Sequence, residues 1–336
     1  MENLLDVSGL KTSFNTKFGE VQAVRGVSFQ LTKGEVVGVV GESGCGKSIT
    51  MMSIMRLLDK NGIIKDGRIF FEGKDISKIT EKEMSKIRGN DIAMIFQDPM
   101  TSLNPLITIG NQIIEPLIIH EKLSKKEAFK KGVELLRLVN IPNPEKRMKQ
   151  YPHEFSGGMR QRAMIAMALS CNPKLIIADE PTTALDVTIQ AQIVEIMKNI
   201  KNKLGTSIIF ITHDLGVVAD ICDRVNVMYG GLIIEKGGIN DIFDNPKHPY
   251  TWGLLDSVPS VQKERKRLKP IEGQPPDLLK PPKGCPFYAR CKFAMNICRE
   301  KMPEFYEVSK KHKVSCWLSD EKAPKVIRAR SREVGL

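Results

Sequence analysis

The chain has 336 residues, 41% of them apolar, which is enough to bury one large core or two ordinary ones. No apolar run approaches the roughly 18 residues that a membrane helix needs, and the N-terminus has no secretion signal, so we expect a soluble cytoplasmic chain. Of the net charge of +12, residues 261–336 contribute ten, with 19 Lys and Arg against 9 Asp and Glu. This basic tail favours a solvated surface, with lipid headgroups or a membrane partner as the alternative.

Short β-branched runs alternate with helical patterns up to about residue 245, which predicts an α/β domain. The expected strands are 35–40, 174–178 and 207–212. Helical periodicity dominates from about residue 100 to 169, so we expect a helical subdomain inserted into the α/β core. The prolines expected to break this stretch into separate helices are Pro105, Pro116, Pro142 and Pro144.

A phosphate-binding loop is predicted directly after the first of these strands. The residues Gly41-Glu42-Ser43-Gly44-Cys45-Gly46-Lys47-Ser48 match the pattern G-x-x-x-x-G-K-[ST], and a helix is expected from about Ser48 to Leu58, so that Ile49 lies in its first turn. Glycines let backbone N–H groups turn toward phosphate oxygens, and the helix N-terminus adds partial positive charge. We therefore expect Lys47 to reach the β- and γ-phosphates of a nucleotide and Ser48 to bind Mg²⁺.

A second chemical signal is the apolar strand 175–178, which runs into Asp179 and Glu180. Two carboxylates at the tip of a buried strand need a partner, because an unpaired buried charge is costly. Asp179 suits Mg²⁺, directly or through water, and Glu180 suits a general base that polarises an attacking water. Taken alone, the pattern fits equally well a strand that ends in a solvated turn.

The segment Phe155-Ser156-Gly157-Gly158-Met159-Arg160-Gln161 distinguishes among the nucleotide-hydrolysing families. By itself, a Ser-Gly-Gly turn opening a helix from about Met159 to Leu169 is most often an ordinary N-cap, although it also presents N–H groups to an anion. After the phosphate loop and the acidic strand, it resembles the LSGGQ signature of the ABC ATPases. Phe155 and Met159 depart from that signature, outside its Ser-Gly-Gly core.

The resemblance to ABC ATPases implies roles for further residues. Gln97 matches the glutamine that senses the γ-phosphate and the transmembrane partner, and we expect it to bind Mg²⁺ with Ser48 and Asp179. His213 matches the histidine that contacts the γ-phosphate. The residues Ala184-Leu185-Asp186 match the D-loop, which ties two active sites together. Phe14 is the expected adenine-stacking residue, and Phe18 competes with it. The implied fold is a P-loop core with an inserted helical subdomain and an antiparallel β-subdomain.

Longer stretches resemble the dipeptide, oligopeptide and nickel importers within this family, over about residues 4–318. They are residues 96–105, 151–162 and 245–251. The resemblance implies ATP as the substrate, two transmembrane permease subunits, and an external peptide-binding protein. It also implies a second ABC ATPase subunit, usually a related but different chain, with a second copy of this chain as the alternative. In such pairs Ser156, Gly157 and Gly158 of one subunit face Lys47 of the other. The implied location is the cytoplasmic side of the membrane.

The remaining chain, residues 251–336, is expected to be a C-terminal extension with a proline-rich linker at 269–283. It carries Cys285, Cys291, Cys298 and Cys316 in the spacing C-x5-C-x6-C-x17-C. Structural zinc usually takes closer pairs, so these gaps favour a [4Fe–4S] cluster, with zinc and free buried thiols as alternatives. A structural staple is the simplest role for such a group, because the segment has few residues for a core of its own.

Three functions can be compared with these motifs. The first is ATP-driven import of dipeptides or oligopeptides, with a nickel importer as its nearest alternative. The second is a soluble ABC ATPase that acts on ribosomes or DNA, but the single phosphate loop and the short spacing between Lys47 and Ser156 do not fit the architecture of those proteins. The third, a non-catalytic binding module, conflicts with the presence of Glu180 and His213. We therefore expect no nucleic-acid partner.

Overall fold

The computed structural model describes residues 2–183, 185–257 and 270–326, and these residues form two compact units. The first unit contains residues 2–5, 30–36, 70–183 and 185–212, and the second contains residues 6–29, 37–69, 213–257 and 270–326. Ala184 of the expected D-loop and Lys269 at the start of the expected linker lie outside the described residues. None of the helices in the described part of the chain is long and apolar enough to cross a membrane.

The first unit contains three parallel strands in the order β6–β7–β8, namely β6 (Ile92–Ile95), β7 (Leu175–Asp179) and β8 (Ser207–Ile211). Every residue of β7 and β8 is buried, which explains their continuous apolar sequence. In the register, Ala178 pairs with Phe210 and Asp179 with Ile211. The predicted alternation of strands and helices is confirmed here, and the parallel register brings both strand ends to the same edge.

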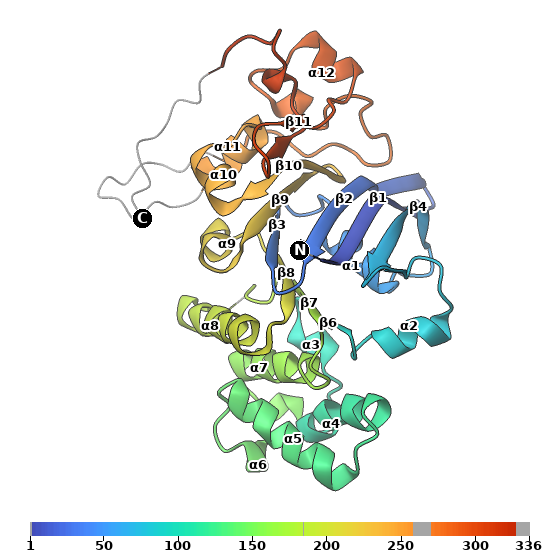
Figure 1. The fold of residues 1–336 in the computed structure, drawn as a ribbon, viewed down its shortest axis with the longest axis vertical. Helices are drawn as coiled ribbons and strands as arrows, with labels where there is room; N and C mark the ends of the chain where they lie inside the picture. The colour runs from blue at the N-terminus through green and yellow to red at the C-terminus, as the bar shows by residue number, and fades with distance from the viewer. Residues whose placement is uncertain (1, 184, 258–269, 327–336) are drawn as a thin grey trace, which may run out of the picture. The chain divides into compact units, whose positions relative to one another are not determined.

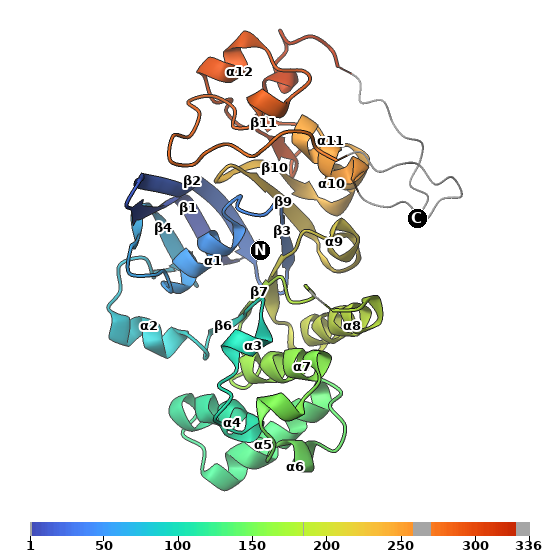
Figure 2. The ribbon, with the colours of Figure 1, turned by 180° about the vertical axis from the view of Figure 1, so that it is seen from behind.

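Helices fill most of the chain between β6 and β7 (Figure 1). Among them α4, α5 and α7 pack against one another, as Figure 2 shows. The bounds are α3 (Pro99–Ser102), α4 (Ile109–His120), α5 (Lys125–Leu138), α6 (Pro144–Arg147), η1 (Pro152–Glu154) and α7 (Gly157–Ala168). Helix α5 begins with a capping box in which Ser124 and Glu127 satisfy each other's backbone N–H groups. The rest of the unit adds β5 (Lys74–Asp75), α2 (Glu81–Ile87) and α8 (Val187–Leu204).

The prediction that Pro116 breaks a helix is wrong, because Pro116 lies inside α4. Proline removes one backbone hydrogen bond to the carbonyl four residues earlier, which costs stability but does not forbid a helix. Ile113 and Leu117, four residues apart on one face, are fully buried, and this packing maintains the helix through the proline. Pro105 and Pro142 lie outside helices as expected, and Pro144 opens α6.

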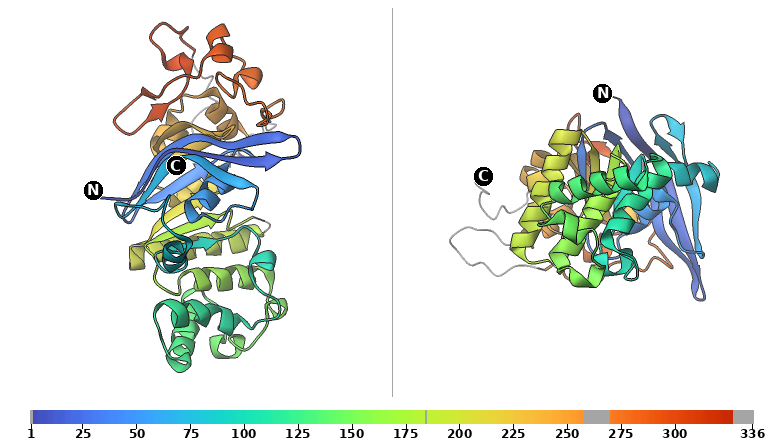
Figure 3. Two further views of the ribbon diagram at one scale, coloured as in Figure 1. Left: turned by 90° about the vertical axis from the view of Figure 1, so that its right-hand side faces the viewer. Right: turned by 90° about the horizontal axis from the view of Figure 1, so that it is seen from below.

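Most of a long hairpin belongs to the second unit; it consists of β1 (Asn3–Thr16) and β2 (Gly19–Thr32), joined by a two-residue turn (Figure 3). Strand β4 (Gly62–Phe71) extends this sheet in the order β2–β1–β4. The other sheet of the unit runs in the order β11–β12–β10–β9–β3, and β3 pairs with β9 in parallel. Its strands are β3 (Val36–Val40), β9 (Arg224–Tyr229), β10 (Leu232–Gly238), β11 (Tyr306–Glu307) and β12 (Lys313–Val314).

Five α-helices of the second unit are short. They are α1 (Lys47–Met55), α9 (Leu215–Ile221), α10 (Ile239–Asp244), α11 (Pro249–Asp256) and α12 (Asn296–Glu300). The predicted end of the first of these at Leu58 is wrong, since α1 ends at Met55. Arg56 follows in the left-handed conformation, with its N–H bonded to the carbonyls of Met52 and Ser53, and this geometry closes the helix.

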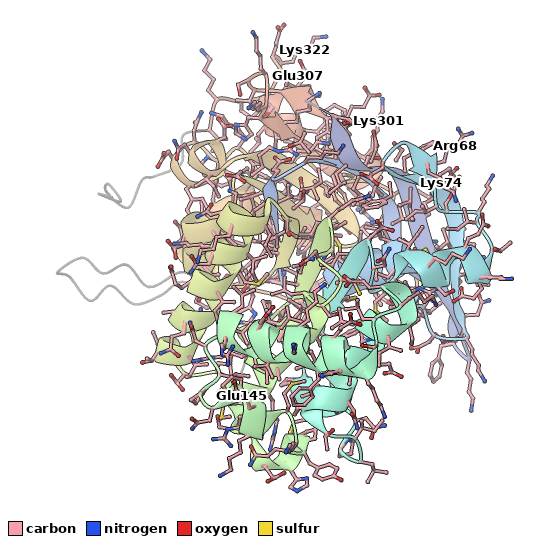
Figure 4. The ribbon with its side chains drawn as sticks, turned by 60° about the horizontal axis from the view of Figure 1, so that its bottom comes forward. Arg68, Lys74, Glu145, Lys301, Glu307 and Lys322 are labelled. Carbon is pink, nitrogen blue, oxygen red and sulfur yellow. The ribbon has the colours of Figure 1, made fainter. Side chains whose placement is uncertain are left out.

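The segment after residue 270 has little regular structure but is attached to the rest of its unit. Residues 270–283 form neither helix nor strand, as their prolines predict, and η2 (Tyr288–Arg290) and η3 (Trp317–Ser319) are single turns. Strand β12 pairs antiparallel with β10, where Val314 lies opposite Glu235. Lys301, Glu307 and Lys322 are exposed on this segment (Figure 4). The attachment to β10 thus supplies order that the segment's own sequence lacks.

A buried carboxylate fastens this segment to β10. Glu235 and His312 are both fully buried, and His312 Nε2 lies 2.8 Å from Glu235 Oε1. The same carboxylate accepts hydrogen bonds from the backbone N–H groups of Lys247 at 2.6 Å and His248 at 3.0 Å. Three segments of the chain therefore meet at one buried carboxyl group.

Candidate functional site

The phosphate loop connects β3 to α1 and depends on glycine where the backbone passes close to other atoms. Gly41 has a φ of 153°, and a Cβ there would lie 2.3 Å from the carbonyl oxygen of Met228 and 2.8 Å from Cys45 Sγ. Only glycine fits such a position. Ser43 and Gly44 follow at the exposed side of the loop, and α1 begins at Lys47 directly after Gly46. The predicted strand, loop and helix are confirmed in this order.

Lys47 is the first residue of α1 and is only 5% exposed. Its ammonium group donates hydrogen bonds to the carbonyl oxygens of Gly41 at 2.9 Å and Glu42 at 3.1 Å, which directs the cation along the inside of the loop. Ser48 and Ile49 follow in the first turn and are half-buried. The loop therefore places a cation and a helix N-terminus together, the combination that binds phosphate.

Two residues far along the chain hold Glu42 of this loop. The Tyr250 hydroxyl accepts a hydrogen bond from the Glu42 N–H at 2.8 Å, and burial raises the pKa of Tyr250 well above its ordinary value, so it remains a neutral phenol. Arg290 binds the Glu42 carboxylate with two hydrogen bonds, at 2.6 and 3.0 Å. Sequence reasoning missed both contacts, because neither residue belongs to a nucleotide-binding motif.

His213 lines a cleft of the second unit together with residues of the phosphate loop. The cleft is lined by Val40, Gly41, Glu42, His213, Leu215, Leu254, Ser257, Pro270 and Ile271. The structure thus brings the predicted histidine to the predicted loop. Two of the lining residues, Pro270 and Ile271, come from the C-terminal linker, which no motif connects with nucleotide binding.

In the first unit, Asp179 ends β7 and Glu180 follows it in a left-handed conformation with a φ of 47°. This conformation is uncommon for a residue other than glycine and is typical of functional sites. The backbone N–H of Glu180 donates to the carbonyl of Ile211 at 3.0 Å, which fixes the turn. Its carboxylate accepts from Gln97 Nε2 at 3.2 Å and from the Thr183 hydroxyl at 2.8 Å. Gln97 and Glu180, predicted from separate motifs, are therefore neighbours.

The predicted signature turn lies at the N-terminus of α7. Ser156 caps the helix by accepting from the Met159 N–H at 3.4 Å, so the ordinary N-cap is present along with the signature pattern. Helix α7 begins at Gly157, two residues before the predicted start. Gly158 lies against Ile189 of α8, where a Cβ would come within 2.9 Å of that side chain. The first turn of α7 is thus packed against the helix that follows the D-loop.

Asp186 of the predicted D-loop is the N-cap of α8 and accepts from the Ile189 N–H at 2.9 Å. The two candidate adenine-stacking residues differ in their surroundings. Phe14 is half-buried in β1 against Gly62, whereas Phe18 in the hairpin turn is 90% exposed. Only the Phe18 ring presents a wholly open face to a ligand.

All four cysteines of the C-terminal segment line one small cavity. Its lining also includes His248, Phe287 and Trp317, and each pair of the four thiols lies close enough to interact electrostatically. Burial raises the pKa of Cys285 and of Cys316 to about 12. All seven cysteines of the chain carry free thiols. In the described part of the chain no group of three or more His, Cys, Asp or Glu side chains has an arrangement that could hold a metal ion.

His248 brings an unpartnered polar atom to this cavity. Its Nδ1 accepts a hydrogen bond from the Tyr250 N–H at 3.0 Å, and burial lowers the pKa of His248 to about 4, so Nε2 carries the proton of a neutral ring. The buried Nε2 has no hydrogen-bond partner within the described residues. A buried donor without an acceptor is uncommon in proteins.

The sequence matches two described families. Residues 24–183 match the family described as ABC transporter, and residues 234–298 match the one described as oligopeptide/dipeptide transporter, C-terminal region. The chain is 57% identical to the oligopeptide transport ATP-binding protein OppD of Bacillus subtilis, covering 98% of this chain and 94% of that one. It is 56% identical to the dipeptide transport ATP-binding protein DppD of the same organism, covering 97% and 98%.

Solved structures with a similar fold are ATP-binding cassettes. The dimeric cassette MJ0796 with bound ADP and phosphate has a TM-score of 0.64 at 26% identity, covering 70% of this chain and 98% of that one. The protein cbiO1 of Clostridium perfringens has a TM-score of 0.62 at 29% identity, covering 73% and 92%. The fold is therefore that of a P-loop ABC ATPase with mixed α/β sheets. The chain belongs to the family of ATP-binding proteins of ABC transporters, within the oligopeptide and dipeptide group, and it is an ATPase.

Proposed function

We propose that this chain hydrolyses ATP on the cytoplasmic side of a membrane to power the import of dipeptides or oligopeptides. The main support is the 57% identity to a protein named for oligopeptide transport, which extends over 98% of this chain. The ATPase part and the C-terminal part are therefore matched by the same relative. The relatives' names refer to peptide rather than metal transport, which favours peptides over nickel.

In this proposal the phosphate loop binds the triphosphate. Lys47, held inside the loop by two carbonyl groups, exchanges those contacts for the β- and γ-phosphate oxygens. Ser48 and Asp179 would hold Mg²⁺, which neutralises phosphate charge when bound. We assign adenine stacking to Phe18 rather than to Phe14, because its exposed ring needs no rearrangement to meet a base.

We assign the general base to Glu180. Its uncommon backbone conformation and its contacts with Gln97 and Thr183 fix the carboxylate at the end of a buried strand, where it can orient an attacking water. Gln97 then reports on the state of that carboxylate through a direct hydrogen bond. His213, on the cleft of the phosphate loop, contacts the γ-phosphate in this scheme.

A second ATPase subunit, a related chain, completes the site. The N-terminus of α7 with Ser156, Gly157 and Gly158 supplies N–H groups to the γ-phosphate of the partner's ATP. Asp186 and its neighbours connect the two sites. Closing two subunits on ATP performs work only if ATP binds the closed pair more tightly than the open one.

The two permease subunits require a docking surface on the first unit. Four large apolar side chains around the Gln97 segment and α3 are exposed to between 36% and 85%, namely Phe96, Met100, Leu106 and Ile107. Exposed apolar side chains in one segment favour a protein partner. We propose that a helix of the permease binds there, so that movement at Gln97 reaches the membrane.

The test is Glu180→Gln in the assembled transporter. We expect ATP turnover to fall by roughly 10³-fold while ATP binding is retained, because the amide keeps the shape of the side chain but cannot accept a proton. Peptide uptake by the variant should stop as well. In the wild-type transporter, peptides but not nickel should stimulate ATP turnover, and this comparison identifies the transported substrate. Normal turnover in the variant would refute the assignment of Glu180.

We also propose that Cys285, Cys291, Cys298 and Cys316 bind a [4Fe–4S] cluster. Support for this group comes from the four thiols that line one cavity, and from the neighbouring His248, whose buried Nε2–H has no acceptor. The four thiols are not yet arranged to hold a metal ion, so binding a cluster would draw them closer together. When bound, such a cluster would cross-link a segment that has little core of its own. Cytoplasmic thiols remain reduced, which keeps the four residues available as ligands.

Iron, zinc and acid-labile sulfide should be measured on protein purified without oxygen. We expect about four irons and four sulfides per chain, and their loss in Cys298→Ala but not in Cys171→Ala, whose thiol is buried in the first unit. One zinc in place of iron would identify the alternative metal. Neither metal in the wild-type protein would refute the cluster.

A further inference from the structure

Arg290 reaches the phosphate loop from the cysteine segment. It ends the single turn η2 and directly precedes Cys291, yet its guanidinium forms a two-point ion pair with Glu42, 248 residues earlier in the chain. The Arg290 side chain is only 5% exposed and that of Glu42 is 26% exposed. An ion pair with this geometry and this degree of burial is among the stronger ones in proteins.

The other donors of Arg290 fix the position of the guanidinium. Nε donates to the carbonyl of Glu272 at 2.9 Å, Nη2 to the carbonyl of Ile271 at 2.8 Å, and Nη1 to the Tyr229 hydroxyl at 3.1 Å. The guanidinium also lies over the rings of Tyr229 and Phe287, at 5.8 and 5.9 Å from their centres. Arg290 thus binds the linker, β9 and the phosphate loop at once.

Glu42 is the carboxylate within the loop that receives a polyanion. Its carbonyl oxygen accepts a hydrogen bond from Lys47 Nζ, so its backbone is part of the phosphate-binding geometry. A carboxylate at this place repels an incoming triphosphate unless a cation neutralises it. Arg290 supplies that cation through its two hydrogen bonds to the Glu42 carboxylate.

We propose that Arg290 is a positioning residue for ATP, through which the cysteine segment controls the affinity of the phosphate loop. The inference rests on the proposed role of this loop in ATP binding. It goes further in making the C-terminal segment part of the nucleotide site rather than an attached module. Any movement of residues 285–291 therefore also moves the Arg290 guanidinium, which neutralises Glu42.

The test compares Arg290→Gln, Glu42→Gln and the double variant in the full-length chain, with ATP affinity measured by displacement of a fluorescent ATP analogue. Arg290→Gln leaves the Glu42 charge unpaired and should weaken ATP binding about tenfold. Glu42→Gln leaves the Arg290 charge and should bind ATP equally or more tightly. The double variant should return to within about threefold of wild type, because neither charge remains.

A purely structural contact predicts a different pattern, in which all three variants bind ATP more weakly and the double variant is the weakest. That pattern, or unchanged affinity in Arg290→Gln, would overturn the inference. Arg290→Lys keeps the charge and should lie between wild type and Arg290→Gln, which gives a second measurement if the glutamine variant folds poorly. In the assembled transporter we expect the KM for ATP to rise in Arg290→Gln with kcat little changed.

Lys47→Ala separates this inference from the proposed function on which it rests. If Lys47→Ala loses ATP binding while Arg290→Gln binds like the wild type, the loop is the phosphate site and only the role of Arg290 fails. If Lys47→Ala binds ATP normally, the proposed function of the loop fails, and the role of Arg290 fails with it. Thermal unfolding of each variant confirms that a change in affinity does not reflect loss of the fold.

Discussion

The phosphate loop and the cysteine cavity, both in the second unit, are built in opposite ways. The loop motif is eight successive residues, six between a strand and a helix and two in the first turn of that helix, and its glycines determine the backbone shape. The cavity gathers four cysteines from 32 residues that form only short turns, short strands and the one-turn helix α12. In the first site the Lys47 ammonium is bound by carbonyl groups of the loop itself, whereas the second contains a buried donor without a partner. A short regular motif can shape its own site, but a coreless segment depends on a bound group or on neighbouring strands.

The largest expected effect comes from adding one methyl group to the loop. Gly41→Ala places a Cβ within 2.3 Å of the Met228 carbonyl, so the loop must move, and ATP binding should weaken about 100-fold. The matched control is Gly44→Ala, where no other atom lies within 4 Å and the cost is limited to backbone strain of about 1–2 kcal/mol. Equal effects of the two substitutions, measured by nucleotide titration, would show that loop shape does not govern affinity.

The corresponding test of the cavity is Cys316→Ala. This cysteine lies beyond the matched C-terminal region, and its loss should remove the bound group and lower the free energy of unfolding by about 3 kcal/mol. Cys222→Ala, also buried in the second unit, should retain the group and lose less stability. Thermal unfolding together with iron analysis distinguishes the two variants, and an equal loss in both would indicate packing alone.

Tyr250→Phe perturbs the part of the molecule that lies between these two sites. The substitution removes the acceptor of the Glu42 N–H and should cost about 1–3 kcal/mol of stability, because a partly buried donor is left unpaired. Tyr151→Phe serves as the control, since Tyr151 is 40% exposed and water replaces whatever its hydroxyl loses. Thermal unfolding of both variants measures the difference, and equal stability would argue against a structural role for the Tyr250 hydroxyl.

The smallest expected effect concerns the adenine end of the site. Phe18→Ala should raise the Kd for ATP about fivefold, through lost stacking, and leave stability unchanged, since the ring is 90% exposed. Phe14→Ala should instead lower stability, because that ring packs on Gly62. The reverse result, in which Phe14→Ala alone weakens ATP binding, would restore Phe14 as the stacking residue.

What could be predicted from the sequence depended on how local the determinants are. The phosphate loop and the turn at Ser156 were predictable because each is a few adjacent residues whose types dictate the backbone. The Arg290 contact was not, since its partner is 248 residues away and no pattern joins them. The prediction that Pro116 breaks a helix fails because the burial of Ile113 and Leu117 outweighs the unfavourable helix propensity of proline. The end of α1 was placed too late, because Arg56 carries no sequence signal for a left-handed residue.

The burial of Glu235 limits how related sequences can diverge. Its carboxylate is wholly enclosed, and one of its contacts, His312, comes from the last part of the described chain. Deleting that part would leave a buried carboxylate with one hydrogen-bond partner fewer, which costs about 1–3 kcal/mol. A relative that lacks residues equivalent to 306–316 should therefore carry an uncharged side chain in place of Glu235. We therefore expect Glu235 to be present in relatives that have β12 and His312, and absent in relatives that lack them.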